Sequence, residues 1–184
     1  YFNLPEVAEY WRNVINLNQW QQKRISRLII EKLFGTVTGK KIAILGFSFK
    51  ANTNDTRESP AIQICKDLLD EGAELAIHDP RVSKKNMEFE LGIKSKNIDE
   101  SNSRIKENSL TEELFFYSCK NINETINGAD AVVILTEWNE YKNLNPDLFN
   151  KNMRKPAWIF DCRDVLKNTQ VGKNSINYWR VGKG

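Results

Sequence analysis

The sequence predicts an α/β fold with a doubly wound, mainly parallel sheet. Short apolar runs alternate with amphipathic stretches from residue 41 onward, which is typical of parallel strands joined by helices. The polar residues that follow each apolar run would then gather at one edge of the sheet. A long amphipathic segment precedes this alternating region and predicts a long N-terminal helix.

Composition excludes several classes of protein. The 184 residues are 40% hydrophobic and 28% charged, which is enough for one core or for one domain with an appendage. The 27 basic and 24 acidic residues are interspersed, which disfavours a nucleic-acid binder. The longest apolar run is Ala131–Leu135, far below the ~18 residues that span a membrane. No secretory signal opens the sequence, so we expect a cytoplasmic protein.

The residues that usually carry catalysis are scarce. Cys65, Cys119 and Cys162 are widely spaced and odd in number, which predicts neither a disulfide framework nor a zinc site. His78 is the single histidine and cannot build a histidine metal site alone. We therefore expect no metal and no complete catalytic machinery in this chain.

The first helix is predicted from Pro5 to Leu33. Asn3 and Glu6 have the spacing of a capping box, Pro5 suits the first turn, and Gly35 suits the end. A helix of roughly thirty residues spans ~45 Å, which is longer than a small domain needs. The helix either packs on the core or connects this domain to a preceding one.

The alternating region contains short elements. The predicted helices are 60–70, a turn at 123–126 and a helix from 145, and residues 83–113 are interpreted as a surface excursion with room for some helix. The predicted strands are 41–46, 74–79, 114–117, 131–136, 157–161 and a closing edge strand at 176–181. Right-handed crossovers place the loops after 46, 79, 136 and 161 at one edge, where we expect a ligand.

The loop at residues 46–59 is the most informative stretch. It stands where a dinucleotide-binding fold carries GxGxxG, but the second and third glycines are missing and Phe47 and Phe49 occupy the turn. Lys50 and Arg57 instead offer cations that suit phosphate oxygens, and Phe49 offers a wall for a ring. The alternative is an ordinary solvated loop.

Arg163 follows the strand at 157–161 and would share the sheet edge with Lys50, so the two could converge on one anion. The alternative for Arg163 is a surface ion pair with Asp161 or Asp164.

Several other polar residues have simpler interpretations. We expect Asp79 to cap the turn at Pro80 rather than to bind a ribose. We expect His78 to be a neutral packed residue and Cys65 to belong to the core. Trp138 is expected to anchor its loop, which we prefer to a role for Glu137 at the edge.

Five stretches of the sequence resemble the C-terminal part of the UDP-glucose 6-dehydrogenase family. They occur in the family's order and cover most of the chain: NLPEVAEYW, TVTGKKIAILGFSFKANTNDTRES, DEGAELAIHDP, ADAVVILTEW and KPAWIFDCRDVL. The resemblance implies a central connecting and dimerisation helix at 1–35 and a Rossmann-like UDP-sugar-binding domain at 36–184.

The resemblance also implies roles for residues. Phe49, Lys50 and Arg163 match substrate-contacting positions, and Arg57 matches an arginine that reaches the NAD. The family oxidises UDP-glucose to UDP-glucuronate with two NAD, through a thioester on a cysteine in a GGSCF-like segment. That segment does not occur here, so this chain alone would be inactive. The resemblance also implies that NAD is held mainly by an N-terminal Rossmann domain, because the Gly-rich NAD loop is absent from this chain. Residues 32–36 match a segment concerned with hexamer assembly, so a homo-oligomer, dimer or hexamer, is implied.

Two departures from the family pattern lie beside Arg163. Cys162 replaces a glycine, so Arg163 would point differently if that backbone needs a positive φ. Asp164 replaces a second arginine and lowers the local positive charge. Two other functions stay open: a related dehydrogenase acting on GDP-mannose or a UDP-aminosugar, and a non-catalytic nucleotide-binding module.

Overall fold

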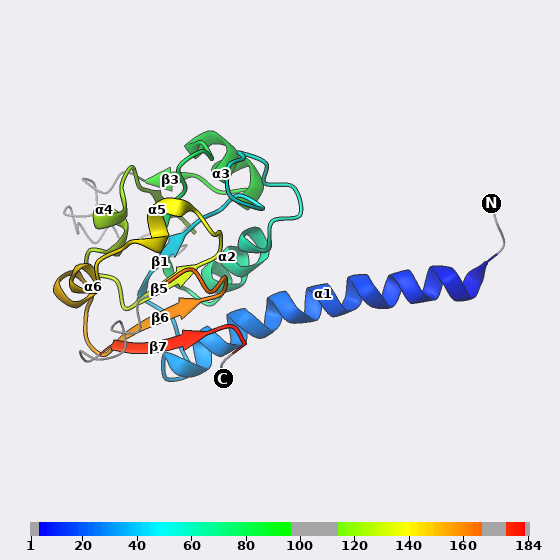
Figure 1. Cartoon of the computed structure of the whole chain (residues 1–184), viewed down its shortest axis with the longest axis horizontal. Coiled ribbons are helices and arrows are strands. Elements are labelled where there is room, and N and C mark those ends of the chain that lie inside the picture. Colours follow the sequence, from blue (N-terminus) through cyan, green and yellow to red (C-terminus); the bar gives the residue numbers. More distant parts are fainter. Residues whose placement is uncertain (1–3, 97–113, 167–175, 183–184) are drawn as a thin grey trace.

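A computed structural model describes residues 4–96, 114–166 and 176–182, and Figure 1 shows its arrangement. A seven-stranded sheet has the order β3-β4-β2-β1-β5-β6-β7, and every neighbouring pair is parallel. The strands are β1 (Lys41–Leu45), β2 (Glu74–His78), β3 (Ser95–Lys96), β4 (Phe116–Ser118), β5 (Ala131–Ile134), β6 (Ala157–Asp161) and β7 (Ile176–Arg180). The predicted doubly wound α/β fold is confirmed.

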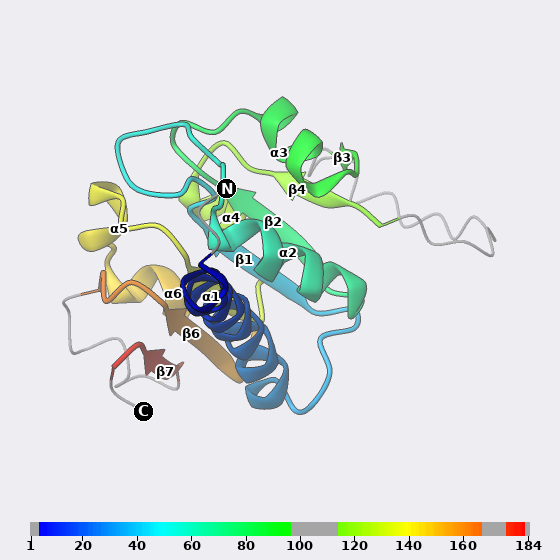
Figure 2. The ribbon, with the colours of Figure 1, turned by 90° about the vertical axis from the view of Figure 1, so that its right-hand side faces the viewer.

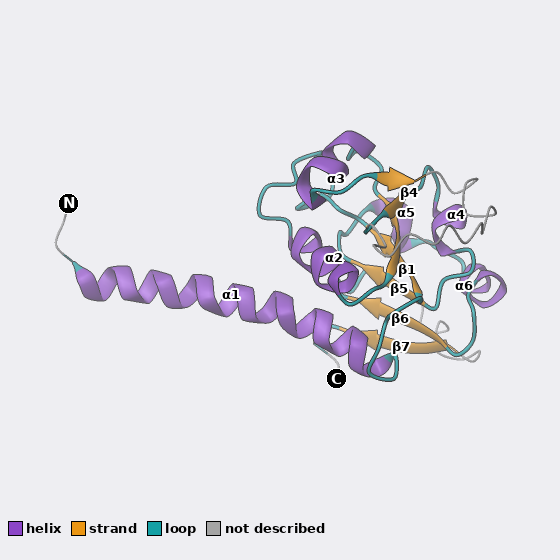
Figure 3. Ribbon diagram, turned by 180° about the vertical axis from the view of Figure 1, so that it is seen from behind, coloured by secondary structure: helices purple, strands orange, loops and turns teal. Residues whose placement is uncertain are grey.

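Helices cover both faces of the sheet, which Figure 3 shows from behind. The helices are α1 (Pro5–Lys32), α2 (Pro60–Asp70), α3 (Lys84–Leu91), α4 (Ile122–Ile126), α5 (Asn139–Lys142) and α6 (Pro146–Asn152). Alternate residues of each strand face opposite sides. In β1, Ile42 and Ile44 pack with α1, α2 and α3, whereas Ala43 and Leu45 pack with α4, α5 and α6.

Only the second half of α1 belongs to this core. Ile25 and Ile29 are buried, and the hydroxyl of Ser26 donates to the Asp67 carboxylate of α2 at 2.6 Å. The first half projects beyond the carboxyl edge of the sheet, as Figures 1 and 3 agree. It leaves large side chains exposed in this chain: Leu4, Val7, Tyr10, Trp11, Ile15, Leu17 and Trp20. The predicted packing on the core thus holds for the second half of α1, and the role of the first half as a connector to a preceding domain stays a prediction.

The ends of α1 differ slightly from the prediction. The helix begins at Pro5 with Leu4 as its N-cap and no side-chain cap, and the predicted cap Asn3 lies outside the described residues. It ends at Lys32, because Phe34 and Gly35 both adopt left-handed backbone conformations. The amide of Gly35 donates back to the Ile30 carbonyl at 2.9 Å and closes the last turn.

The helix that the predicted excursion at 83–113 allowed for is present as α3, Lys84–Leu91. Ser83 caps α3 by accepting from the amide of Asn86, and Gly92 ends this helix at φ 74°. Met87 and Leu91 are buried in the main core. The strand β3 adds one more parallel edge beside β4, and the rest of the segment, from residue 97, lies outside the described residues.

Candidate functional site at the carboxyl edge of the sheet

All parallel strands end at one edge, so the loops after β1, β2, β5 and β6 lie together there. Figure 2 shows the cyan loop from β1 to α2 at the same end of the sheet as α5. We call residues 46–59 the first site loop and residues 162–166 the second site loop. The first contains Phe49, Lys50 and Arg57, and the second contains Arg163.

The first site loop leaves β1 through a close contact with the loop after β5. Gly46 has φ 94°, and a Cβ at this position would lie 2.4 Å from Cβ of Thr136. The Thr136 hydroxyl donates to the Ser48 carbonyl at 2.7 Å. Only glycine therefore fits at residue 46, and its role is to bring these two loops into contact.

Asp79 organises the start of the first site loop from the end of β2. Its Oδ2 accepts from the amides of Phe47 and Ser48 at 2.7 and 2.9 Å, and from the Ser48 hydroxyl at 3.0 Å. The same oxygen accepts from Nε1 of Trp138 at 3.2 Å. Its Oδ1 accepts from the amides of Arg81 and Val82. The predicted turn cap is confirmed, but it is only one half of what this carboxylate does.

The charge state of Asp79 follows from these contacts. Burial by itself would raise the pKa of this carboxyl group. The hydrogen bonds that its oxygens accept from backbone amides outweigh burial and leave the pKa below its usual value. Asp79 is therefore ionised at neutral pH, so a negative charge lies directly beside the turn after β1.

The rest of the first site loop is held by its own backbone. The Phe49 amide donates to the Asp55 carbonyl at 2.9 Å, and the Thr56 hydroxyl donates to Glu90 of α3 at 2.6 Å. Asn52 and Glu58 have positive φ values of 66° and 58°. One bond within the loop and one bond to α3 thus hold the backbone that carries Phe49 and Lys50. Phe49 and Lys50 are nevertheless exposed, so the predicted alternative of a solvated polar loop is not contradicted.

The side chains that this loop presents are exposed. Phe49 is 45% exposed, and Lys50 makes no ion pair within the part of the chain that is described. Arg57 is paired with Asp55 of its own loop through two bonds, Nε to Oδ1 at 2.9 Å and Nη2 to Oδ2 at 2.7 Å. The side-chain hydrogen bond from Arg57 lowers the pKa of Asp55 to about 2.

The second site loop is organised by Asp161, the last residue of β6. Its carboxylate is fully buried and accepts from the amides of Arg163, Val165 and Leu166. The Tyr178 hydroxyl of β7 donates to the same group at 3.1 Å. Asp161 is thus a backbone anchor, and the predicted alternative of an ion pair between it and the Arg163 guanidinium is wrong.

The Arg163 side chain turns toward the loop after β5. Its Nε donates to the Leu135 carbonyl at 2.9 Å and lies 3.8 Å from Oε2 of Glu137. Because Leu135 precedes Thr136, which binds Ser48, one short segment connects the two site loops. The other predicted partner, Asp164, pairs with Arg180 instead. The predicted alternative of a surface ion pair for Arg163 is therefore confirmed, with Glu137 as the partner.

Cys162 does not have the positive φ under which we expected Arg163 to point differently. Among the described residues, the positive φ in this loop falls at Asp164, with φ 52°, and not at Cys162. The condition for a differently aimed Arg163 is therefore not met. Burial raises the pKa of the Cys162 thiol to about 12, so this cysteine is not a thiolate at neutral pH.

The remaining chemical groups are structural. His78 is buried, and its Nδ1 lies 3.0 Å from the Tyr141 hydroxyl. Burial lowers the pKa of His78 below its usual value, which fits the predicted neutral packed residue. Burial raises the pKa of the Cys65 and Cys119 thiols, so neither is a thiolate at neutral pH. Trp138 is buried and anchors its loop on Asp79, as predicted.

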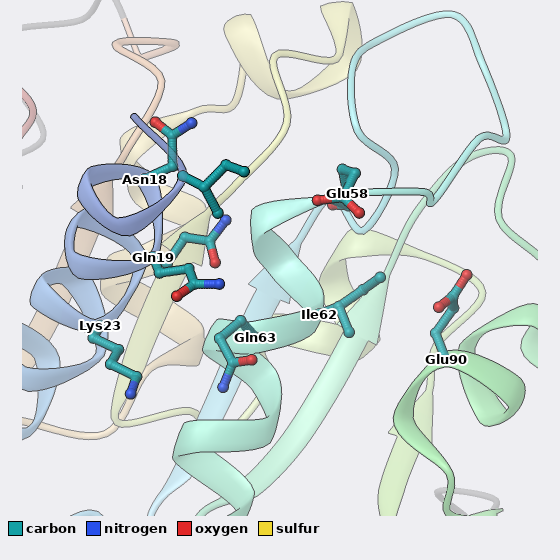
Figure 4. Close-up of a pocket in the computed structure, with 10 residues that line it drawn as sticks. Asn18, Gln19, Lys23, Glu58, Ile62, Gln63 and Glu90 are labelled. Atoms are coloured by element: carbon teal, nitrogen blue, oxygen red, sulfur yellow. The ribbon is translucent and has the colours of Figure 1, made fainter. Parts of the chain in front are cut away.

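A separate groove of about 630 Å³ lies between α1 and the start of α2, and Figure 4 shows its lining. Side-chain amides dominate it, with Glu58 and Glu90 at the far end. Neither Lys50 nor Arg163 lines this groove. Within the described ranges no group of histidine, cysteine and acidic side chains could hold a metal ion, and no helix there is long and apolar enough to cross a membrane.

Sequence comparison identifies the family to which this chain belongs. Residues 43–168 match the model of the UDP-glucose/GDP-mannose dehydrogenase family, UDP binding domain. This chain belongs to that family. The matched range contains both site loops, the Asp79 anchor and the Asp161 anchor.

Relatives and solved structures of this dehydrogenase family agree with the match. The chain is 47% identical to the UDP-glucose 6-dehydrogenase of Mus musculus over 176 residues, and 38% identical to UDP-glucose 6-dehydrogenase 4 of Arabidopsis thaliana over 187 residues. These alignments cover 96% and 98% of this chain but only 34% and 37% of the relatives. The chain therefore spans about a third of their length.

The fold likeness extends to archaeal enzymes. An NDP-N-acetyl-D-galactosaminuronic acid dehydrogenase from Methanosarcina mazei superposes with a TM-score of 0.63 at 23% identity, over 88% of this chain and 28% of that one. A UDP-glucose dehydrogenase from Pyrobaculum islandicum superposes with a TM-score of 0.60 at 22% identity, over 91% of this chain and 31% of that one. At these identities the likeness concerns the fold.

Proposed function

We propose that this chain is the UDP-sugar-binding part of an NAD-dependent UDP-glucose 6-dehydrogenase, which oxidises UDP-glucose to UDP-glucuronate. The observation that carries the proposal is the arrangement at the carboxyl edge, where Asp79 fills the turn that would otherwise bind a phosphate. Recognition of a diphosphate then falls to the side chains of Lys50 and Arg163. Membership of the family supports UDP as the nucleotide.

Lys50 and Arg163 would bind the two phosphates from separate loops. Lys50 supplies a mobile point charge, and Arg163 supplies a planar fork whose Nε is already held by the Leu135 carbonyl. Phe49 would form a wall beside the bound nucleotide. Binding energy from the nucleotide would hold the sugar in place for oxidation on another part of the enzyme.

The residues described here do not fit NAD in the usual turn of such folds. The second and third glycines are absent, and the amides of Phe47 and Ser48 are already occupied by Asp79. We propose that NAD binds mainly to another domain and that Arg57 contacts it from outside the turn. The exposed side chain of Arg57, oriented by Asp55, supports such a contact.

We further propose that residues 1–35 serve as a connecting and dimerisation helix and residues 36–184 as the UDP-sugar-binding domain. The exposed apolar side chains on the first half of α1 support a contact with a second copy, because they would leave water there. Light scattering after size exclusion should give at least a dimer. A strictly monomeric protein at high concentration would contradict this part of the proposal.

Calorimetry of the intact protein with UDP, UDP-glucose and GDP-mannose tests the proposed substrate class. We expect UDP and UDP-glucose to bind, and GDP-mannose to bind at least about tenfold more weakly, a difference of about 1.4 kcal/mol. Tighter binding of GDP-mannose would favour the second candidate, a GDP-mannose dehydrogenase, which the family's description also includes. Nucleotide binding without oxidation by the full-length protein in the presence of NAD would favour a non-catalytic module, since this chain alone is expected to be inactive in either case.

A further inference from the structure

The carboxylate of Asp79 occupies a position where backbone amides, from a turn or from the start of a helix, usually bind a phosphate. In dinucleotide-binding folds the turn after the first strand presents backbone amides to the pyrophosphate. Here the two amides that follow Gly46, those of Phe47 and Ser48, both donate to Oδ2 of Asp79. The turn therefore already contains an anion, and this chain supplies it.

We infer that Asp79 is a positioning residue for the nucleotide, acting through the turn that carries Phe49 and Lys50. The inference rests on the proposed binding of a UDP sugar. Three contacts fix Ser48, two residues before Lys50: its amide and hydroxyl donate to Asp79, and its carbonyl accepts from Thr136. The Phe47 carbonyl accepts from Ser59 at the far end of the loop. The backbone that leads to Lys50 thus has little freedom.

The same carboxylate excludes a second anion from the turn. A phosphate bound to these amides would have to displace Oδ2 from contacts of 2.7 and 2.9 Å, or lie against a buried negative charge. Asp79 also accepts from Trp138, so displacing it would leave a buried indole donor without a partner. One side chain thus both orients the first site loop and closes its turn to a dinucleotide phosphate.

A pair of variants separates this role from simple structural support. Asp79→Asn removes the charge at the carboxyl end of β1. Asp130→Asn is the matched control, because Asp130 accepts from the Lys41 amide at the opposite end of the same strand, at 2.9 Å. We expect Asp79→Asn to weaken UDP binding by about tenfold and Asp130→Asn to change it by less than about twofold, although both lower the melting temperature.

A double-mutant cycle tests whether Asp79 acts through Lys50. In a Lys50→Ala background, Asp79→Asn should cost less than about threefold in UDP affinity, whereas in an Arg163→Ala background it should still cost about tenfold. An equal cost in both backgrounds would overturn the inference. So would a folded Asp79→Asn protein whose UDP affinity matches that of the wild type.

Amide hydrogen exchange keeps the test independent of the ligand. Asp79→Asn should accelerate exchange at 46–51 and leave 162–166 unchanged, and unchanged exchange at 46–51 would overturn the inference. A wild-type protein that fails to bind UDP would contradict the proposed function, while this exchange measurement would still decide the role of Asp79. If Asp79→Asn does not fold, Ser48→Ala serves instead, because it removes the hydroxyl that donates to Asp79. It should likewise accelerate amide exchange at 46–51.

Discussion

The two site loops are built in the same way but present their cations differently. A buried aspartate at the end of a strand anchors each loop. Asp79, directly after β2, anchors the first loop, which itself follows β1, and Asp161, the last residue of β6, anchors the second. Lys50 of the first loop is exposed and unpaired among the described residues, whereas Arg163 is held by the Leu135 carbonyl. The comparison shows that backbone anchoring and side-chain anchoring are separate properties of a binding loop.

The largest expected effect is on the free energy of unfolding and follows from removing the charge of an anchoring aspartate. Asp161→Asn should lower the free energy of unfolding by about 3 kcal/mol, because a fully buried group that accepts three amides and one hydroxyl loses its charge. Denaturant unfolding measures this change. Asp164→Asn is the control: it breaks only the partly exposed pair with Arg180 and should cost less than about 1 kcal/mol.

Removing each cation tests the contrast between them directly. Lys50→Ala and Arg163→Ala should each weaken UDP affinity by roughly ten- to a hundredfold, since a charged hydrogen bond contributes about 1.5–3 kcal/mol. Only Arg163→Ala should also reduce stability, by about 1 kcal/mol, because it alone loses a bond to the Leu135 carbonyl. Calorimetry and thermal unfolding of both variants separate the two effects. No loss of affinity for Lys50→Ala would show that its assignment is wrong.

The free energy of unfolding should also depend on pH through His78, which lies at the end of β2 beside the first site loop. Burial lowers the pKa of His78 in the folded protein, so the unfolded chain binds its proton first as the pH falls. The stability contributed by neutral His78 is present above about pH 6.5 and is lost as the pH decreases toward the lowered folded value. His78 is the single histidine, so His78→Asn should flatten the dependence of unfolding free energy on pH between 7.5 and about 5. An unchanged slope would contradict this.

The smallest expected effect on UDP concerns Arg57. Its guanidinium is exposed and bound to Asp55, so Arg57→Ala should change UDP affinity by less than about threefold. If Arg57 contacts NAD as proposed, the same variant should weaken NAD affinity in the intact enzyme more than UDP affinity. Equal losses of UDP affinity for Arg57→Ala and Lys50→Ala would remove the distinction between them.

The sequence predicted the elements whose patterns are local. The apolar runs at 41–46 and 131–136 are β1 and β5, and the helix predicted at 60–70 matches α2. The four-residue helix α5 was missed, because a polar stretch of this length has no periodicity to measure. Its one buried side chain, Tyr141, lies three residues after Trp138, and that spacing was the available signal.

The two aspartate anchors were harder to predict than the positions of Lys50 and Arg163, whose role in binding stays a prediction. Lys50 and Arg163 follow strands, so topology alone brings them to one edge. Asp79 binds amides more than thirty positions earlier, and Arg163 binds a carbonyl 28 positions earlier. Contacts between a side chain and a distant backbone group leave no pattern in the residues themselves. An aspartate at the carboxyl end of a buried strand is the signal that both anchors share.

Among the described residues, the first half of α1 projects from the core and is fixed only through the second half of the helix. About 26 Å of helix separates Pro5 from Gln22, just before the first buried residue, Ile25. A tilt of about 10° at the embedded end would move the free end by about 4–5 Å, close to one helical turn. The packing of Ile25 and Ile29 against the core therefore sets where the Leu4 end of this arm points.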